Sequence, residues 1–107
     1  YTRDLAVLLA DMIQSEKDGV YHATNEGFCS WAEFAAEIFR QAGMDIKVTP
    51  VPSSAYPTRA VRPHNSRMSK KSLREAGFSL LPRWQDAVGR YLIELESMKE
   101  QREALAE

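Results

Sequence analysis

The sequence is poor in residues that form cross-links, metal sites and membrane spans. Cys29 is its single cysteine, which excludes an internal disulfide and suits a reducing compartment. Its two histidines, His22 and His64, lie far apart without other metal-ligating residues nearby, which argues against a zinc site. No apolar run is long enough to cross a bilayer, and no secretory signal is recognisable. We therefore expect no metal, no membrane partner and a cytoplasmic location.

The sequence also lacks the motifs of a self-sufficient enzyme. It has no glycine-rich phosphate loop, no supported Ser/His/Asp set and no pair of carboxylates in an apolar setting. We therefore predict that the chain by itself holds no catalytic residue and binds no cofactor.

Acidic residues are absent between Asp45 and Glu75, although both flanks are rich in them. The net charge of the whole chain is −1, so this stretch is a local excess of positive charge. A nucleic-acid-binding domain is usually basic throughout, so we expect no nucleic-acid partner. A cationic loop on an otherwise acidic domain favours an anion such as a phosphate or pyrophosphate. The basic residues are Lys47, Arg59, Arg62, Arg67, Lys70, Lys71 and Arg74.

The patterning of the 107 residues predicts one small, helix-rich α+β domain. We expect helices over residues 4–16, 30–43, 69–77 and from about 82 onwards, and short strands over residues 20–23 and 46–52. The apolar stripe of the last helix thins after Met98. We therefore assign residues 1–98 to the domain and residues 99–107 to a solvated helical tail.

The second helix has the clearest local signature. Ser30 and Glu33 form a capping box, and Cys29 and Phe34 occupy the positions of a hydrophobic staple. We expect this helix to pack on the first and fourth helices through the side chains of Trp31, Phe34, Ile38 and Phe39. Trp84 is also predicted to lie in the core, whereas Lys70, Lys71 and Arg74 are predicted to form a solvated helix face.

Arg62 is the leading candidate for contact with an anion. Pro63 biases it towards an extended conformation, from which its planar guanidinium can bind a phosphate with two hydrogen bonds. Tyr56 and Arg59 could add a stacking ring and a second cation. The alternatives are a solvated loop and a tyrosine that packs the loop onto the domain.

Seven short motifs then occur in a familiar order. Together they resemble the C-terminal part of the dTDP-4-dehydrorhamnose reductase family, which belongs to the extended short-chain dehydrogenases/reductases. The resemblance covers roughly residues 1–95. The motifs are Gly19-Val20-Tyr21-His22, Ser30-Trp31-x-Glu33-Phe34-Ala35, Val51-Pro52-Ser53, Tyr56-Pro57 with Ala60, Arg62-Pro63-x-x-Ser66, Leu73 with Gly77, and Pro82-x-Trp84.

The resemblance implies the substrate-binding domain of an α/β Rossmann enzyme that reduces dTDP-4-dehydro-L-rhamnose to dTDP-L-rhamnose with NADPH or NADH. In that family the cofactor loop and a Tyr-x-x-x-Lys pair belong to the N-terminal Rossmann domain, and no tyrosine of this chain has a lysine four positions later. The Arg-Pro-x-x-Ser loop is expected to meet the substrate. The loop matches Arg62, Pro63 and Ser66 here. The predicted substrate-binding residues are therefore Arg62 first, then Ser66 from this match and Tyr56 and Arg59 from the aromatic and charge pattern.

Two other readings of the resemblance stay open. Nucleotide-sugar epimerases and dehydratases share the architecture, and some relatives are regulatory modules without activity.

Residue 1 is not methionine and reads as the entry to a helix, so we expect a piece of a longer protein. The expected partners are a dTDP-sugar and the N-terminal Rossmann domain, and the parent could also form a homodimer.

Overall fold

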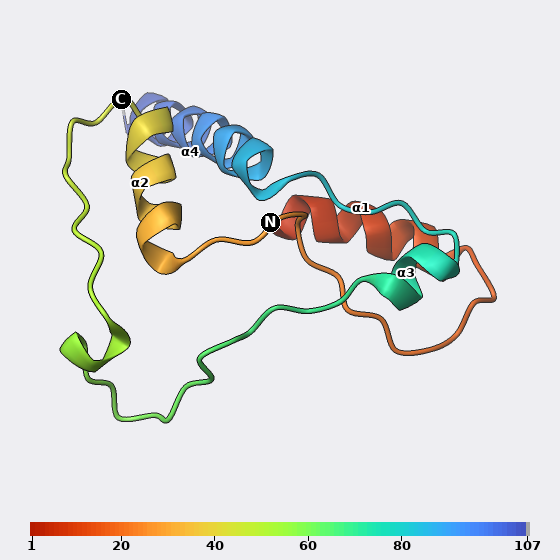
Figure 1. The fold of residues 1–107 in the computed structure, drawn as a ribbon. Helices are drawn as coiled ribbons and strands as arrows, with labels where there is room; N and C mark the ends of the chain where they lie inside the picture. Colours follow the sequence, from red (N-terminus) through yellow and green to blue (C-terminus); the bar gives the residue numbers. More distant parts are fainter. Residues whose placement is uncertain (107) are drawn as a thin grey trace.

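In the computed structural model, which describes residues 1–106, the chain forms four α-helices and one short 3-10 turn (Figure 1). A long irregular segment separates α2 from α3. The elements are α1 (Thr2–Ile13), α2 (Trp31–Gln41), η1 (Ser53–Ala55), α3 (Lys71–Glu75) and α4 (Trp84–Ala106). The helix-rich character predicted from the sequence is confirmed.

The predicted strands are absent from residues 1–106. Residues 20–23 and 46–52 form no ladder, and one isolated parallel bridge joins Glu26 to Arg83. An extended segment becomes a strand only when a neighbour satisfies its backbone N–H and C=O groups. Within the described residues the two segments have no such neighbour, so the β part of the α+β prediction is wrong for this structure.

The first helix begins and ends earlier than predicted. Its end at Ile13 is set by Ser15, whose backbone N–H and hydroxyl both donate to the carbonyl of Met12 at 3.0 Å. Only Leu8 of the apolar stripe is buried, against Leu73 and Leu81, while Ile13 is 82% exposed. Within residues 1–106 this helix is therefore buried on one side only.

The predicted ends of α2 are confirmed. Ser30 Oγ accepts from the Glu33 N–H at 3.1 Å, and Glu33 Oε1 accepts from the Ser30 N–H at 3.2 Å, which completes the capping box. At the other end Gly43 has a φ of +69°, and Met44 N–H donates to the Phe39 carbonyl at 2.9 Å. This is the arrangement of a Schellman cap, which favours glycine at that position.

The second helix packs mainly on α4 rather than on both α1 and α4. The rings of Phe34 and Trp84 lie 5.8 Å apart, and Gln41 Nε2 donates to the Gln85 carbonyl at 2.8 Å. Trp31 stands at the first position of α2 and is 86% exposed, with only an edge contact to Phe34. Its predicted place in the core is wrong. So is the packing role of Cys29, which is exposed.

The short α3 is anchored by its apolar residue. Leu73 is fully buried. The N-cap is Lys70, with no side-chain cap, while Ser69 Oγ accepts from the Lys71 N–H at 3.3 Å one position outside it. The helix predicted over residues 69–77 therefore begins after Lys70, and the Ser69 hydroxyl satisfies a free N–H of its first turn.

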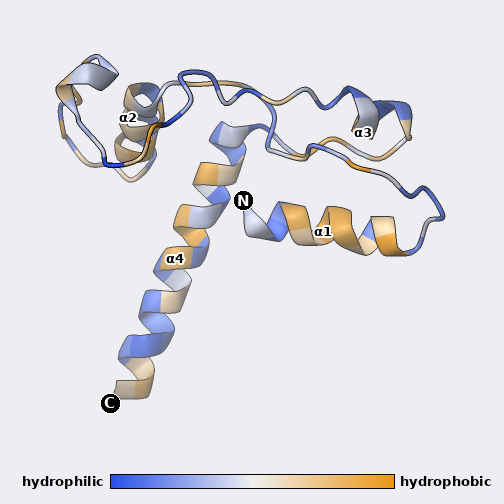
Figure 2. Cartoon of the chain, turned by 90° about the horizontal axis from the view of Figure 1, so that it is seen from below, coloured by the Kyte–Doolittle hydropathy of each residue, from blue (hydrophilic) through white to orange (hydrophobic). Residues whose placement is uncertain are grey.

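The chain is less compact than is usual for a protein of this length. Its radius of gyration is 17.5 Å, against about 13 Å for a compact domain of this size. Its accessible surface is 9044 Å², whereas about 6,000 Å² is typical of a folded monomer of this mass. Figure 2 shows α4 projecting away from α1, and residues 95–106 of α4 are exposed. None of the helices within residues 1–106 combines the length and apolar character needed to span a bilayer.

Candidate functional site

The four predicted substrate-binding residues lie on a single irregular segment between α2 and α3, which we call the basic loop (residues 44–70). Figure 1 shows this segment running as a wide excursion away from the helices. Residues 49–69 are all exposed, and the only regular structure among them is η1. The loop therefore presents its side chains to solvent rather than to a core.

The structure does not bring the four predicted residues together. Tyr56 follows η1 and is 77% exposed, so its ring does not pack the loop onto the domain. Arg59, Arg62 and Ser66 are exposed as well. Within residues 1–106 no hydrogen bond or ion pair joins any two of them. The loop offers separate polar groups, which form no preformed site with the rest of the described residues.

The charges of the basic loop are largely uncompensated. Arg59, Arg62 and Arg67 have no carboxylate within 4 Å among the described residues, in contrast to Lys71 of α3, which lies 3.7 Å from Glu75. Asn65 Oδ1 accepts from both the N–H and the Nε of Arg67, each at 3.1 Å. The guanidinium groups of this segment therefore remain available to an anion.

Lys70, at the end of the basic loop, is buried, so its prediction as a solvated residue is wrong. Its Nζ donates to Thr24 Oγ1 at 3.1 Å and to the Asn25 carbonyl at 3.4 Å. It also lies 3.3 Å from Glu26 Oε1, in an ion pair without hydrogen-bond alignment. Sequence reasoning missed this residue because its partners are more than 40 positions away and carry no local signal.

A second polar cluster fixes the turn that Lys70 contacts. Asp4 is buried and accepts two hydrogen bonds of 2.7 Å from Arg90 and one of 2.8 Å from Asn25 Nδ2. Asn25 Nδ2 also donates to the Pro82 carbonyl at 3.0 Å. The Arg90 guanidinium, aided by Asn25, lowers the pKa of the Asp4 carboxyl below its usual value. The cluster therefore joins α1, the turn at Asn25 and α4.

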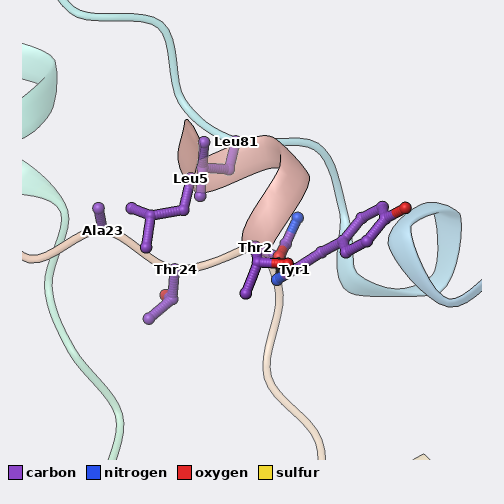
Figure 3. Close-up of a pocket in the computed structure, with 7 residues that line it drawn as sticks. Tyr1, Thr2, Leu5, Ala23, Thr24 and Leu81 are labelled. Atoms are coloured by element: carbon purple, nitrogen blue, oxygen red, sulfur yellow. Dashed lines mark hydrogen bonds between the residues drawn. The ribbon is translucent and has the colours of Figure 1, made fainter. Parts of the chain in front are cut away.

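A cavity of about 370 Å³ opens beside this cluster (Figure 3). Its volume is near the lower end for small-molecule pockets. Its lining is mainly apolar and includes none of the four predicted substrate residues. The lining residues are Tyr1, Thr2, Leu5, Ala23, Thr24, Asn25 and Leu81. Within residues 1–106 no group of three or more potential metal ligands occurs either.

The architecture places the chain in a known class of proteins. It superimposes with a TM-score of 0.83 on a crystal structure of dTDP-4-dehydrorhamnose reductase from Bacillus anthracis in complex with NADP, at 38% identity. The match covers 88% of this chain and 34% of that one. A family model described as the RmlD substrate binding domain matches residues 1–97. The chain belongs to this family.

Curated relatives agree with this assignment. The spore coat polysaccharide biosynthesis protein SpsK of Bacillus subtilis is 37% identical over 98 residues, which are 91% of this chain and 34% of that protein. The dTDP-4-dehydrorhamnose reductase of Shigella flexneri is 41% identical over 86 residues, which are 75% of this chain and 29% of that enzyme. The chain thus spans about a third of the length of these relatives.

The residues of this chain do not fit a dinucleotide cofactor. Binding of NAD(P) in a Rossmann fold needs a glycine-rich turn between a strand and a helix. The sequence has no such run, and residues 1–106 contain no strand on which it could be mounted. No step of a reduction can therefore be assigned to a cofactor held by this chain.

Proposed function

We propose that this chain is the nucleotide-sugar-binding part of an NAD(P)H-dependent reductase that converts dTDP-4-dehydro-L-rhamnose into dTDP-L-rhamnose. The observation that carries the proposal is the family match over residues 1–97. The NADP complex of the structural relative and the reductase relatives support the cofactor and the reaction class. The SpsK relative supports a role in polysaccharide biosynthesis.

In this proposal the basic loop binds the pyrophosphate of the substrate. Arg62 donates to the phosphate oxygens, while Arg59 and Ser66 add a cation and a hydroxyl, and Tyr56 offers a ring for the base. The support is the exposure of these side chains and the absence of carboxylates near Arg59 and Arg62 within residues 1–106. Phosphate oxygens accept hydrogen bonds from guanidinium groups in a bidentate geometry, which favours arginine for this role.

The remaining parts of the reaction belong to the rest of the enzyme. We propose that an N-terminal Rossmann domain supplies the cofactor loop and the proton donor. In this proposal residues 1–98 complete the substrate site and residues 99–106 form a solvated helical tail, while residue 107, which the same prediction included, lies outside the described residues. A cytoplasmic location suits a reaction between a nucleotide sugar and NAD(P)H, and a homodimer is compatible with the proposal.

The decisive experiment is a spectrophotometric assay of NADPH oxidation by the complete protein with dTDP-4-dehydro-L-rhamnose. We expect turnover by the complete protein and none by the isolated chain 1–107. Turnover by the isolated chain, free of contaminating enzyme, would overturn the proposal that the cofactor loop and the proton donor lie in an N-terminal domain. A complete protein that binds dTDP-rhamnose without oxidising NADPH would favour a regulatory module. Epimerisation or dehydration of a dTDP-sugar would favour the related enzymes of the same architecture.

A further inference from the structure

The basic loop is attached to the rest of the domain near its two ends, by the Met44 N–H on α2 and by Arg67 and Lys70 before α3. From residue 45 to residue 66, every hydrogen bond of the loop described in the structure is local, such as Thr58 Oγ1 to the Ala60 carbonyl at 2.8 Å. Contacts with other elements begin at Arg67, whose guanidinium lies 5.8 Å from the Phe28 ring centre, and continue at Lys70. At its α3 end, the position of the loop therefore depends on these two basic residues.

Lys70 is bound more completely than a surface lysine would be. Its side chain is 5% exposed, and its ammonium lies within 3.4 Å of a hydroxyl, a carbonyl and a carboxylate oxygen of residues 24–26. Two of these contacts are hydrogen bonds and the third is the ion pair with Glu26, so the ammonium is both hydrogen-bonded and paired with an opposite charge. Its Nζ also lies 5.4 Å from the centre of the Phe28 ring, which attracts a cation.

The turn that receives Lys70 is itself held firmly. The Glu26 N–H donates to the Pro82 carbonyl at 3.0 Å, and the Trp84 N–H donates to the Glu26 carbonyl at 2.9 Å. These two bonds tie the turn to the start of α4. A chain of contacts therefore runs from α4 through residues 24–28 to Lys70 and into the basic loop.

A buried charge is costly unless it is paired and hydrogen-bonded, so a solely stabilising role could be filled equally well by an apolar residue. From this cost and the position of Lys70 we infer that it is a positioning residue. Lys70 fixes the end of the basic loop on the turn of residues 24–28 and so sets the affinity for the dTDP moiety, without touching the substrate. The inference rests on the proposed function of the loop and names a residue that the proposal did not include.

The test is calorimetric titration of dTDP, and separately of NADPH, into the complete protein and its variants. We expect Lys70→Met to weaken dTDP binding about tenfold, the equivalent of one charge-assisted hydrogen bond. NADPH binding should change less than about twofold, and Lys70→Arg should recover part of the dTDP affinity. Lys71→Met, which alters an exposed lysine next in the chain, serves as the matched control and should leave both affinities unchanged.

A double-mutant cycle separates positioning from general stability. If Lys70 acts through the loop, Lys70→Met should have little further effect on dTDP binding when Arg62→Ala is already present. Equal losses of dTDP and NADPH affinity, or additive effects in the cycle, would show that Lys70 only stabilises the fold. An unchanged dTDP affinity in Lys70→Met would also overturn the inference.

Two further comparisons cover the cases in which Lys70→Met does not fold or the parent does not bind dTDP. Should Lys70→Met fail to fold, Thr24→Val removes one acceptor of the ammonium without leaving a charge unpaired, and it should weaken dTDP binding selectively. Unchanged dTDP binding by Thr24→Val would count against the inference. Should the parent protein itself not bind dTDP, the proposed function fails, and the positioning role fails with it. If the parent binds dTDP and the folded Lys70→Met variant binds it equally tightly, the positioning role of Lys70 is wrong and the proposed function still stands.

Discussion

The guanidinium of Arg90 donates two parallel hydrogen bonds of 2.7 Å to the carboxylate of Asp4, 86 positions earlier in the chain. Arg90 also donates to Asp86 at 2.8 Å on its own helix. The pair joins the start of α1 to α4. Because Asn25 shares the Asp4 carboxylate, this ion pair also orients the turn on which Lys70 is seated. The charge pair near the core and the candidate site are thus parts of one network.

The Asp4–Arg90 pair should make stability depend on pH in acid. The folded state lowers the pKa of Asp4 chiefly through Arg90, so the stabilisation is complete above the unfolded pKa of about 3.9. It is lost as the pH falls from there through the lower, folded pKa. We expect Asp4→Asn to cost about 1–2 kcal/mol at pH 7, because the Arg90 side chain remains 36% exposed and water screens the pair.

Urea melts of the complete protein and of Asp4→Asn between pH 7 and pH 3 provide the measurement. The difference between the two free energies of unfolding should be constant above about pH 4 and should shrink as the pH falls below it towards the folded pKa of Asp4. Asp11→Asn changes an exposed carboxyl on the same helix and is the matched control. A constant difference between parent and Asp4→Asn down to pH 3 would contradict the assignment.

The contact of α2 with α4 should depend on Phe34 and not on its neighbour Trp31. Phe34 is half-buried against Trp84, so Phe34→Ala should cost about 2 kcal/mol, less than a fully buried phenylalanine would. Trp31 is 86% exposed, so Trp31→Ala should change stability by less than about 0.5 kcal/mol. Denaturant melts of both variants decide the point, and an equal or larger loss in Trp31→Ala would mean that the tryptophan is covered by another surface.

Gly43 and Gly27 both have a positive φ, but an added Cβ would have free space at Gly43 and a steric clash at Gly27. Gly43 has a φ of +69°, and a Cβ added there would meet no atom within 4 Å, whereas Gly27 has a φ of +94° and its Cβ would lie 3.0 Å from Trp84 Cδ1. Gly43→Ala should therefore cost about 1–2 kcal/mol for the left-handed conformation alone. Gly27→Ala should exceed it by about 1 kcal/mol or more, the cost of overpacking. Thermal melts that rank the two variants in the opposite order would refute this account.

Local sequence signals predicted where the helices lie, and they predicted the ends of α2 best, because those ends are set by neighbouring residues. Ser30, Glu33 and Gly43 define α2 within a single segment, and each acts as its residue type suggests. Sequence patterns could not predict which apolar faces are covered, since burial depends on distant partners. Trp31 has the spacing of a core residue but no surface within residues 1–106 to pack against, and the two expected strands have no neighbour there.

In the candidate site, too, local features could be predicted from the sequence and long-range contacts could not. The charge of the basic loop and the place of Arg62 in it could be predicted, because both are properties of consecutive residues. The burial of Lys70 could not, because it depends on residues 24–26 approaching from more than 40 positions away. Which residues of the loop meet the substrate stays a prediction that only binding measurements can test.

Arg62 provides that test. In the complete protein Arg62→Ala should weaken dTDP-rhamnose binding by about 1.5–3 kcal/mol, the range for a hydrogen bond to a charged partner. Arg62→Lys should recover only part of this loss, because an ammonium keeps the charge but not the bidentate geometry. Calorimetric titration of dTDP-rhamnose is the measurement.

The matched control for Arg62 is Arg74→Ala, which removes an exposed basic residue of α3 that lies outside the basic loop. It should leave dTDP-rhamnose binding unchanged. If both variants lose affinity equally and the loss vanishes at high salt, the loop acts only through its overall charge, since screening removes interactions between exposed charges. If Arg62→Ala binds as tightly as the parent while folded, Arg62 is a solvated surface residue and the pyrophosphate is bound elsewhere.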